Sequence, residues 1–205
     1  MIDLKYKCMQ CGICCHEVPG EYSKRIPVYP EEAERLIAIA KKKGVHFRVI
    51  EDLVFPDIKN KKILVVTYRI RLDNEDQCCP FYHEDVGCTV HNVKPLACQA
   101  YPLALKQEDA FNFKIDIDPL CNFVIENYDE LTDSNMEDIK EIFPEEYKNA
   151  EAHLKKNKRI MIKVRELEYQ KKIKILRKIK VEDFNKYLKD WDRKEIIIED
   201  NNEDE

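Results

Sequence analysis

The sequence predicts an α+β fold in which a small cysteine-cluster domain with hairpin strands precedes a helical C-terminal appendage. Three observations support this prediction. A stretch with helical spacing follows Pro30, a stretch rich in β-branched residues covers positions 63–72, and the composition changes after Pro144. All nine cysteines, all nine prolines and all four glycines lie at or before Pro144. The turns and any thiol chemistry therefore belong to the first part of the chain.

The first helix should begin near Glu31. Proline suits the first helical position because its φ is already near the helical value, and the acidic residues after Pro30 suit the positive end of the helix dipole. Apolar residues then recur at helical spacing, at Ala33, Leu36, Ile37 and Ala40. Gly44 follows three lysines and suits the C-terminal cap. The pattern predicts a helix that ends at this glycine.

Two hairpins are predicted from alternation and turn chemistry. Residues 49–72 are β-like, with a turn at 59–62, and we interpret them as scaffold sheet. Residues 103–107 and 111–117 are the strands of a second hairpin around Glu108 and Asp109. An apolar helical stretch begins at 119–121 and ends the cysteine-bearing region.

The division predicted from these patterns is a cysteine-cluster metal-binding domain at 1–125, an appendage at 126–194 and a tail at 195–205. The appendage is Lys/Glu-rich with helical spacing, although residues 160–164 also alternate like a strand. A helix unbroken from 145 to 180 would be about 54 Å long, so it must bend, project or find a partner. The tail has six acidic and no basic residues, which predicts disorder.

Composition limits the classes of protein that the chain can belong to. With 205 residues and 44% hydrophobic residues it can bury a core, and its net charge of −5 does not by itself favour nucleic acid or a membrane. No apolar run approaches the length of a membrane span, and residues 1–7 lack the apolar region of a secretory signal. We therefore expect a cytoplasmic protein without membrane contact, whose thiols are mostly reduced.

Four thiols lie within eight residues, at Cys8, Cys11, Cys14 and Cys15. In a cytosolic chain such spacing indicates a metal site rather than a disulfide framework. The first three have the C-x2-C-x2-C spacing of a bacterial ferredoxin loop, and Gly12 relieves the steric cost of the turn. Adjacent side chains generally diverge, so Cys14 and Cys15 either serve different centres or only one of them is a ligand.

The identity of the metal stays open on spacing alone. Zinc and iron–sulfur clusters, including a 4Fe-4S cluster, both accept four thiolates. The ferredoxin-like triplet, and a supply of thiols larger than one zinc ion needs, favour the iron–sulfur cluster. Eight thiols also allow two centres with four ligands each.

A second cysteine block completes a recognisable pattern. It contains Cys79-Pro80, then Cys88-Thr-Val-His91, then Lys94-Pro95-Leu-Ala-Cys98-Gln-Ala-Tyr-Pro102, and finally Cys121. Together with the first four thiols this pattern resembles the CxxCxxCC family of zinc- or iron-chelating proteins, also called YkgJ-like cysteine cluster proteins. The resemblance covers about residues 5–125.

The resemblance implies a metal-associated set of eight cysteines, with Cys78 as the spare thiol: Cys8, Cys11, Cys14, Cys15, Cys79, Cys88, Cys98 and Cys121. The family includes flagellin lysine N-methylases, so the resemblance also implies that a protein methylase or a redox activity must be considered. No glycine pair in the chain has a G-x-G arrangement, so a Rossmann-type cofactor loop is absent. The sequence names no catalytic residue.

Three positions depart from the family pattern. The family has arginine where this chain has Lys94 and Gln99, and tyrosine where it has His91. If those arginines grip an anion, lysine does so less well and glutamine not at all. His91 is either a ligand in place of a thiol or a neighbour of the ligands.

The alternative interpretation is a binding module stapled by zinc. Residues 155–180 contain twelve lysines and arginines but only two glutamates, which suits the phosphates of a nucleic acid or an acidic protein partner. A solvated helix face, whose charge the acidic tail partly offsets, explains the same pattern. Tyr169 is the one aromatic residue in this segment, so base stacking has little support.

Overall fold

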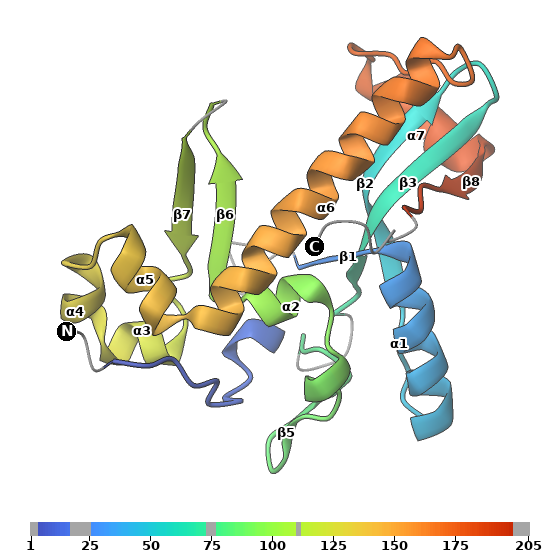
Figure 1. Cartoon of the computed structure of the whole chain (residues 1–205). Helices are drawn as coiled ribbons and strands as arrows, with labels where there is room; N and C mark the ends of the chain where they lie inside the picture. Colours follow the sequence, from blue (N-terminus) through green and yellow to red (C-terminus); the bar gives the residue numbers. More distant parts are fainter. Residues whose placement is uncertain (1–3, 17–25, 73–76, 110–111, 199–205) are drawn as a thin grey trace.

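The computed structural model describes residues 4–16, 26–72, 77–109 and 112–198. Helices and open sheets coexist in this part of the chain, which confirms the predicted α+β class. One long helix, α6 (Pro144–Tyr169), runs diagonally from a lobe of short helices to a sheet at the opposite end (Figure 1). The first cysteine segment and the short helix α2 (Leu96–Ala100) lie beside the start of α6, between these two ends.

Helix α1 (Pro30–Lys43) forms where the sequence predicts it. Pro30 is its first residue, and Gly44 ends it in the left-handed conformation, with φ at 67°. Ala33, Leu36 and Ala40 turn one face of the helix into the core, as their spacing predicts.

The largest sheet has β3 (Lys62–Ile70) at its centre. Strand β2 (Val49–Asp57) pairs with β3 in the predicted antiparallel hairpin and occupies one edge. The other edge is shared by two short strands, β1 (Pro27–Val28) and β8 (Asp192–Glu195). Strand β8 runs parallel to β3, so the last described part of the appendage adds a strand to a sheet from the first part.

Small elements connect this sheet to the cysteines. Two antiparallel pairs follow β3, and the second is the hairpin predicted at 103–117: β4 (Tyr82–His83) with β5 (Gly87–Cys88), and β6 (Leu103–Gln107) with β7 (Phe113–Ile117). Single helical turns, η1 (Ile13–Cys15) and η2 (His91–Val93), carry or flank cysteines. Short elements of this kind derive their stability from the packing around them.

Three short helices form the opposite lobe: α3 (Asn122–Glu126), α4 (Tyr128–Thr132) and α5 (Met136–Ile142). Phe123, Ile142 and Phe143 fill its core, and the ring of Tyr6 packs against both phenylalanines at centroid distances of 5.0 Å. The segment that precedes the first cysteine is therefore part of this lobe.

Helix α6 ends at Tyr169, eleven residues before the end of the stretch considered for an unbroken helix. Its 26 residues span about 39 Å. Ile160 and Val164 lie on one buried helical face, so residues 160–164 are helical and not a strand. After Lys171, whose φ is 56°, the chain turns back and buries Ile173 and Ile175 beside the sheet. The chain therefore bends, which is one of the three outcomes expected of so long a stretch.

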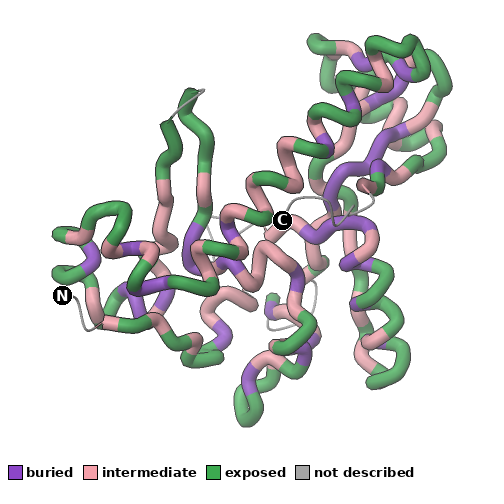
Figure 2. Tube along the Cα trace, in the orientation of Figure 1, coloured by how far each residue is buried: buried purple, intermediate pink, exposed green. Residues whose placement is uncertain are grey.

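The appendage continues with α7 (Val181–Asp190) and β8. The predicted tail begins later than position 195, because Glu195 belongs to β8 and Ile196 is buried in the core with Ile160. Its remaining residues, 199–205, lie outside the described residues. The division at 125/126 stays a prediction, and contacts cross it: α6 packs along α2 and along β6. Figure 2 shows buried positions along both parts. None of the helices in the described ranges is long and apolar enough to cross a membrane.

Candidate metal centre

One cavity brings the predicted cysteines together. All eight line it, from the N-terminal loop, from the segment before β4, from β5, from α2, and from the residue that precedes α3: Cys8, Cys11, Cys14, Cys15, Cys79, Cys88, Cys98 and Cys121. Among the nine cysteines, all of which the structure describes, Cys78 alone does not line it. The thiols lie up to 113 positions apart in sequence, so the fold assembles this set.

The first cysteine loop is attached to the second block by its main chain. The Cys79 N–H donates to the Cys15 carbonyl at 2.7 Å, and His16 forms an isolated antiparallel bridge with Cys78. Within the loop, the Cys15 N–H donates to the Gly12 carbonyl, also at 2.7 Å. These bonds place Cys14 and Cys15 of the first cysteine block beside Cys79 and Pro80 of the second.

Tyr82, on β4, presses against the glycine of the loop. Gly12 has φ at 80°, and a Cβ there would lie 2.2 Å from the Tyr82 Cζ. The Tyr82 hydroxyl donates to the Cys11 carbonyl at 3.1 Å, and the ring of His16 meets the same tyrosine edge-on. Glycine is thus required at position 12 both for its left-handed backbone and for space.

The other end of the loop is held by the helical lobe. The Tyr6 N–H donates to the Ile142 carbonyl at 2.8 Å, and the Lys5 ammonium donates to the Glu141 carbonyl at 2.7 Å. Tyr6 also lines the cavity, and burial, followed by the nearby Cys8 and Cys121 thiols, raises the pKa of its hydroxyl. Cys8 is therefore fixed relative to α5.

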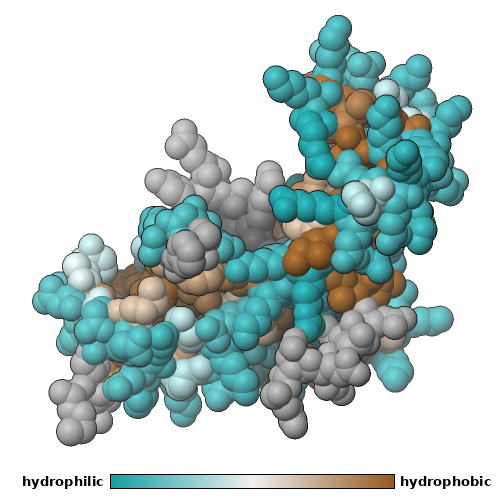
Figure 3. Space-filling model, turned by 45° about the horizontal axis from the view of Figure 1, so that its top comes forward, coloured by the Kyte–Doolittle hydropathy of each residue, from teal (hydrophilic) through white to brown (hydrophobic). Residues whose placement is uncertain are grey.

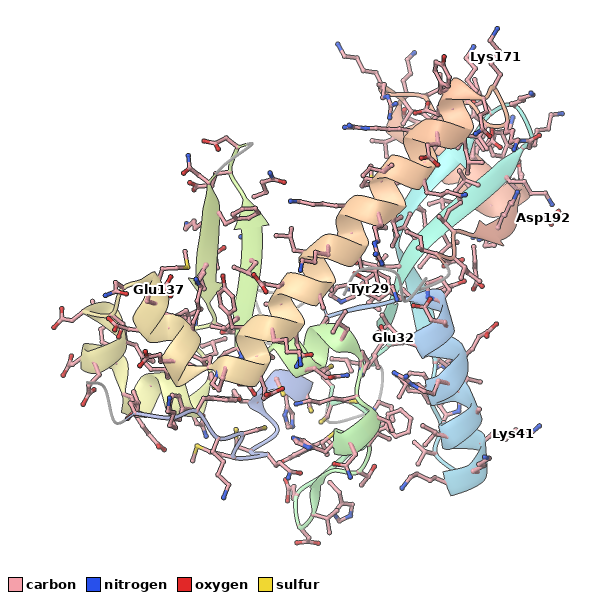
Figure 4. The ribbon with its side chains drawn as sticks, in the orientation of Figure 1. Tyr29, Glu32, Lys41, Glu137, Lys171 and Asp192 are labelled. Carbon is pink, nitrogen blue, oxygen red and sulfur yellow. The ribbon has the colours of Figure 1, made fainter. Side chains whose placement is uncertain are left out.

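Helix α2, which carries Cys98, is anchored by a buried carboxylate of α1. Glu32 Oε1 accepts from the Leu96 N–H at 2.7 Å, and Oε2 accepts from the Tyr29 N–H at 3.0 Å. Burial raises the pKa of Glu32, and these two bonds oppose the shift. Figure 4 labels Glu32 and Tyr29 at the N-terminal end of α1, near α2 and α6. The Glu32 carboxylate, which belongs to α1, thus satisfies the first N–H group of α2.

Three thiols in the cavity lie close enough to shift the pKa values of one another. Cys14 Sγ lies 3.9 Å from Cys15 Sγ, and Cys15 also shares a hydrogen bond with Cys79. The bond to Cys14, then that to Cys79, raise the pKa of Cys15, whereas the bond from Cys15 lowers the pKa of Cys79. Cys15 and Cys79 therefore titrate as a linked pair, in which the interaction between them raises the pKa of one thiol and lowers that of the other.

The more enclosed thiols hold their protons tightly. Burial raises the pKa of Cys98 well above its ordinary value and also raises the pKa values of Cys88 and Cys121. A thiolate is the form that binds a metal, so metal uptake at these positions must displace protons. Cys11, by contrast, lines the cavity and is exposed to solvent.

Two of the three residues that depart from the family pattern line the cavity, and the third does not. Lys94 lines the cavity, and its charge lowers the pKa values of Cys88 and Cys98, in each case as a lesser effect than burial. Gln99 does not line the cavity. Its side-chain amide donates instead to the Lys94 carbonyl at 2.8 Å. His91 lines the cavity, and burial and then Lys94 lower its pKa, so the ring is neutral near pH 7.

The donor set fits a thiophilic metal or an iron–sulfur cluster. Eight sulfurs share one cavity, which is twice the number that a tetrahedral zinc ion or one four-iron cluster takes. No three Cys, His, Asp or Glu side chains in the described ranges already stand at metal-binding distances from one another. A complete coordination shell therefore requires the thiol sulfurs to come closer together than they lie in this structure.

Sequence reasoning did not single out most of the residues that line the cavity besides the cysteines, among them three tyrosines and a histidine. Tyr6, Tyr82, Tyr101 and His16 all contribute to its lining. Burial, together with Asp118, raises the pKa of Tyr101, which keeps its hydroxyl protonated beside the thiols. Proximity to cysteines was the available signal, since His16 directly follows Cys15, Tyr82 is three residues after Cys79 and Tyr101 is three residues after Cys98.

Residues 7–122 match the family model CxxCxxCC, whose description is "Putative zinc- or iron-chelating domain". The matched range contains all eight cysteines of the cavity and extends over more than half of the chain. Neither a curated protein nor a solved structure matches the chain.

Proposed function

Because the chain belongs to the CxxCxxCC family, we propose that its cavity binds an iron–sulfur cluster through cysteine thiolates and that the protein has a redox role. One observation carries the proposal. Eight cysteines from five segments of the chain line a single cavity, whereas the adjacent Cys78 does not. Thiols from segments up to 113 positions apart would not gather around one cavity by chance burial alone.

The number of thiols exceeds what a single zinc ion needs, and the spacing of the first three thiols favours a cluster. One structural zinc is satisfied by four ligands, which would leave four thiols in the cavity without a purpose. A four-iron cluster also takes four thiolates, and the remaining thiols suffice for a second centre. The C-x2-C-x2-C spacing of Cys8, Cys11 and Cys14 is that of a ferredoxin loop.

The lining of the cavity suits a centre that must be shielded from water. When bound, an iron–sulfur cluster accepts and donates single electrons at a potential set by its surroundings. Phe81 is fully buried, and the rings of Tyr6 and Tyr101 are partly buried beside the thiols. Lys94 supplies a positive charge that offsets thiolate charge. Cys11 and the half-exposed Met9 also line the cavity, so they offer a short path from the centre to an electron partner in solution.

The test is anaerobic purification followed by metal analysis and an absorption spectrum. A brown protein with broad absorbance near ~400 nm and about four irons per centre is the expected result. A colourless protein with stoichiometric zinc would contradict the cluster and leave a metal that stabilises the fold. A chain that takes up neither metal, even on reconstitution, would contradict the metal centre itself.

The basic segment of the appendage does not support a second function. Several of its cations have partners within the protein: Lys156 pairs with Glu31, Arg177 pairs with Glu168, and Lys158 lies 4.9 Å from the centre of the Phe113 ring. Hydrophilic side chains cover much of the face drawn in Figure 3. These contacts favour the solvated, structural interpretation of the positive charge over a nucleic-acid interface.

A further inference from the structure

Two histidines line the cavity, and they differ in their hydrogen bonding. His16 Nδ1 lies 2.9 Å from the Gly12 carbonyl oxygen, so its ring is held by the loop that carries it. His91 Nε2 is buried and has no hydrogen-bond partner among the described residues. A buried ring nitrogen without a partner is unfavourable unless a ligand satisfies it, and the His91 residue that carries this nitrogen lines the cavity.

The local fold holds His91 at the cavity. It begins η2, between Cys88 at the end of β5 and Cys98 in α2. The Val93 N–H donates to the Val90 carbonyl at 2.9 Å, and the side chain of Val90 is buried in the same core cluster as Phe81. The hydrogen bond and the packing of Val90 thus fix the backbone turn that carries the His91 ring.

The spacing of His91 suits shared ligation with a cysteine. Two residues separate it from Cys88, which is the separation in a Cys-x2-Cys pair whose two sulfurs face one metal ion. Imidazole nitrogen is an accepted ligand of zinc together with thiolates, and it replaces cysteine in some iron–sulfur centres. Cys88 and His91 both line the cavity.

We propose that His91 Nε2 is a ligand of the metal centre, which gives one centre a mixed sulfur and nitrogen shell. The inference rests on the proposed function, since it requires a metal in the cavity. A neutral imidazole in place of a thiolate makes the centre less negative by one charge. For an iron–sulfur cluster this raises the reduction potential relative to ligation by thiolates alone.

X-ray absorption at the edge of the bound metal tests the inference on the full chain. The wild-type protein should show nitrogen at about 2.0–2.1 Å in addition to sulfur at about 2.3 Å. His91→Ala should remove the nitrogen signal, whereas the matched control His16→Ala should keep it. His91→Cys should retain the metal with sulfur in place of nitrogen, which guards against a variant that merely loses the site.

Two sets of results would overturn the inference. One is a metal-loaded wild-type protein with sulfur alone around the metal. The other is a nitrogen signal that persists in His91→Ala or His91→Cys, or one that disappears in His16→Ala. These results differ from failure of the proposed function, in which the wild-type chain holds no iron–sulfur cluster. If zinc is bound instead, the same nitrogen signal still decides whether His91 is a ligand.

Discussion

A Cβ at position 12 would lie 2.2 Å from the Tyr82 Cζ, so the cysteine loop and β4 fit together only with glycine at that position. The Tyr82 hydroxyl then donates to the carbonyl of the neighbouring Cys11. This contact joins the first cysteine block to the second, which are about 70 residues apart. The shape of the metal cavity therefore depends on it.

Gly12→Ala should cost more stability than Gly44→Ala. Both glycines have positive φ, at 80° and 67°, so each alanine incurs about 1 kcal/mol of backbone strain. Only Gly12 also faces a side chain, since nothing lies within 4 Å of a Cβ at Gly44. Thermal unfolding measured with and without metal should show a larger loss, and weaker metal retention, for Gly12→Ala. Equal losses would mean that the Tyr82 contact is unimportant.

Glu32→Ala should weaken the attachment of α2. It leaves the buried N–H groups of Leu96 and Tyr29 without acceptors, and the expected loss is about 2–3 kcal/mol. The bound metal should also exchange faster, because α2 carries Cys98. Glu34→Ala is the matched control, since Glu34 is exposed on the same helix. Similar unfolding free energies for the two variants would count against the anchoring role.

Asp57 should be the main polar link between the β2–β3 turn and the segment after α6. Its carboxylate is 1% exposed, and Oδ1 accepts from the N–H groups of Lys59 at 3.1 Å and Lys174 at 2.9 Å. Asp57→Ala should lower the unfolding free energy by about 2–4 kcal/mol in denaturant titrations. Asp192→Ala, which removes an exposed ion pair with Lys62, should leave the midpoint nearly unchanged.

The Glu51–Arg193 pair should stabilise the protein in a pH-dependent manner. The hydrogen bond from the Arg193 Nε, at 2.8 Å, lowers the pKa of Glu51 below its ordinary 4.5. A lowered carboxyl pKa adds stability above about pH 4.5, and this stability is lost as the pH falls through the folded-state pKa. Both side chains are about one-third exposed, so the contribution should stay below about 1 kcal/mol.

A double-mutant cycle with Glu51→Gln and Arg193→Gln measures this contribution. The coupling free energy should be favourable at pH 7 and should shrink at pH 4 and below. A coupling that is the same at both pH values would show that packing, and not charge, joins β2 to β8.

Local sequence signals predicted much of the fold. The spacing from Ala33 to Ala40 and the cap at Gly44 placed α1, and alternation with turn residues placed both hairpins. Strand β8 could not be predicted, because Asp192–Glu195 contains only charged residues. Its position follows from main-chain pairing with β3, about 130 residues earlier.

The end of α6 shows how packing can override a local pattern. The Lys-rich sequence continues past Tyr169 without a proline or glycine, yet the helix stops there. Ile173 and Ile175 are two residues apart and both are buried beside the sheet, which an extended segment allows and a helix does not. Alternation of these two isoleucines was the available signal.

The candidate site likewise has residues that the sequence could indicate and residues that it could not. The eight cysteines could be proposed from the sequence because their pattern resembles that of the CxxCxxCC family, and the same resemblance left Cys78 outside the set. The fit of Tyr82 against Gly12 and the buried Nε2 of His91 depend on how distant segments meet. No local pattern carries that information.

The most direct test of the account is the metal content of two adjacent variants, Cys79→Ala and Cys78→Ala, purified anaerobically beside the wild-type protein. Cys79 lines the cavity and Cys78 does not, although the two residues are neighbours in the chain. Cys79→Ala should lose half or more of the bound metal, whereas Cys78→Ala should retain the wild-type amount. Equal metal content in the two variants, whether kept or lost, would contradict the claim that the eight-thiol cavity is the metal site.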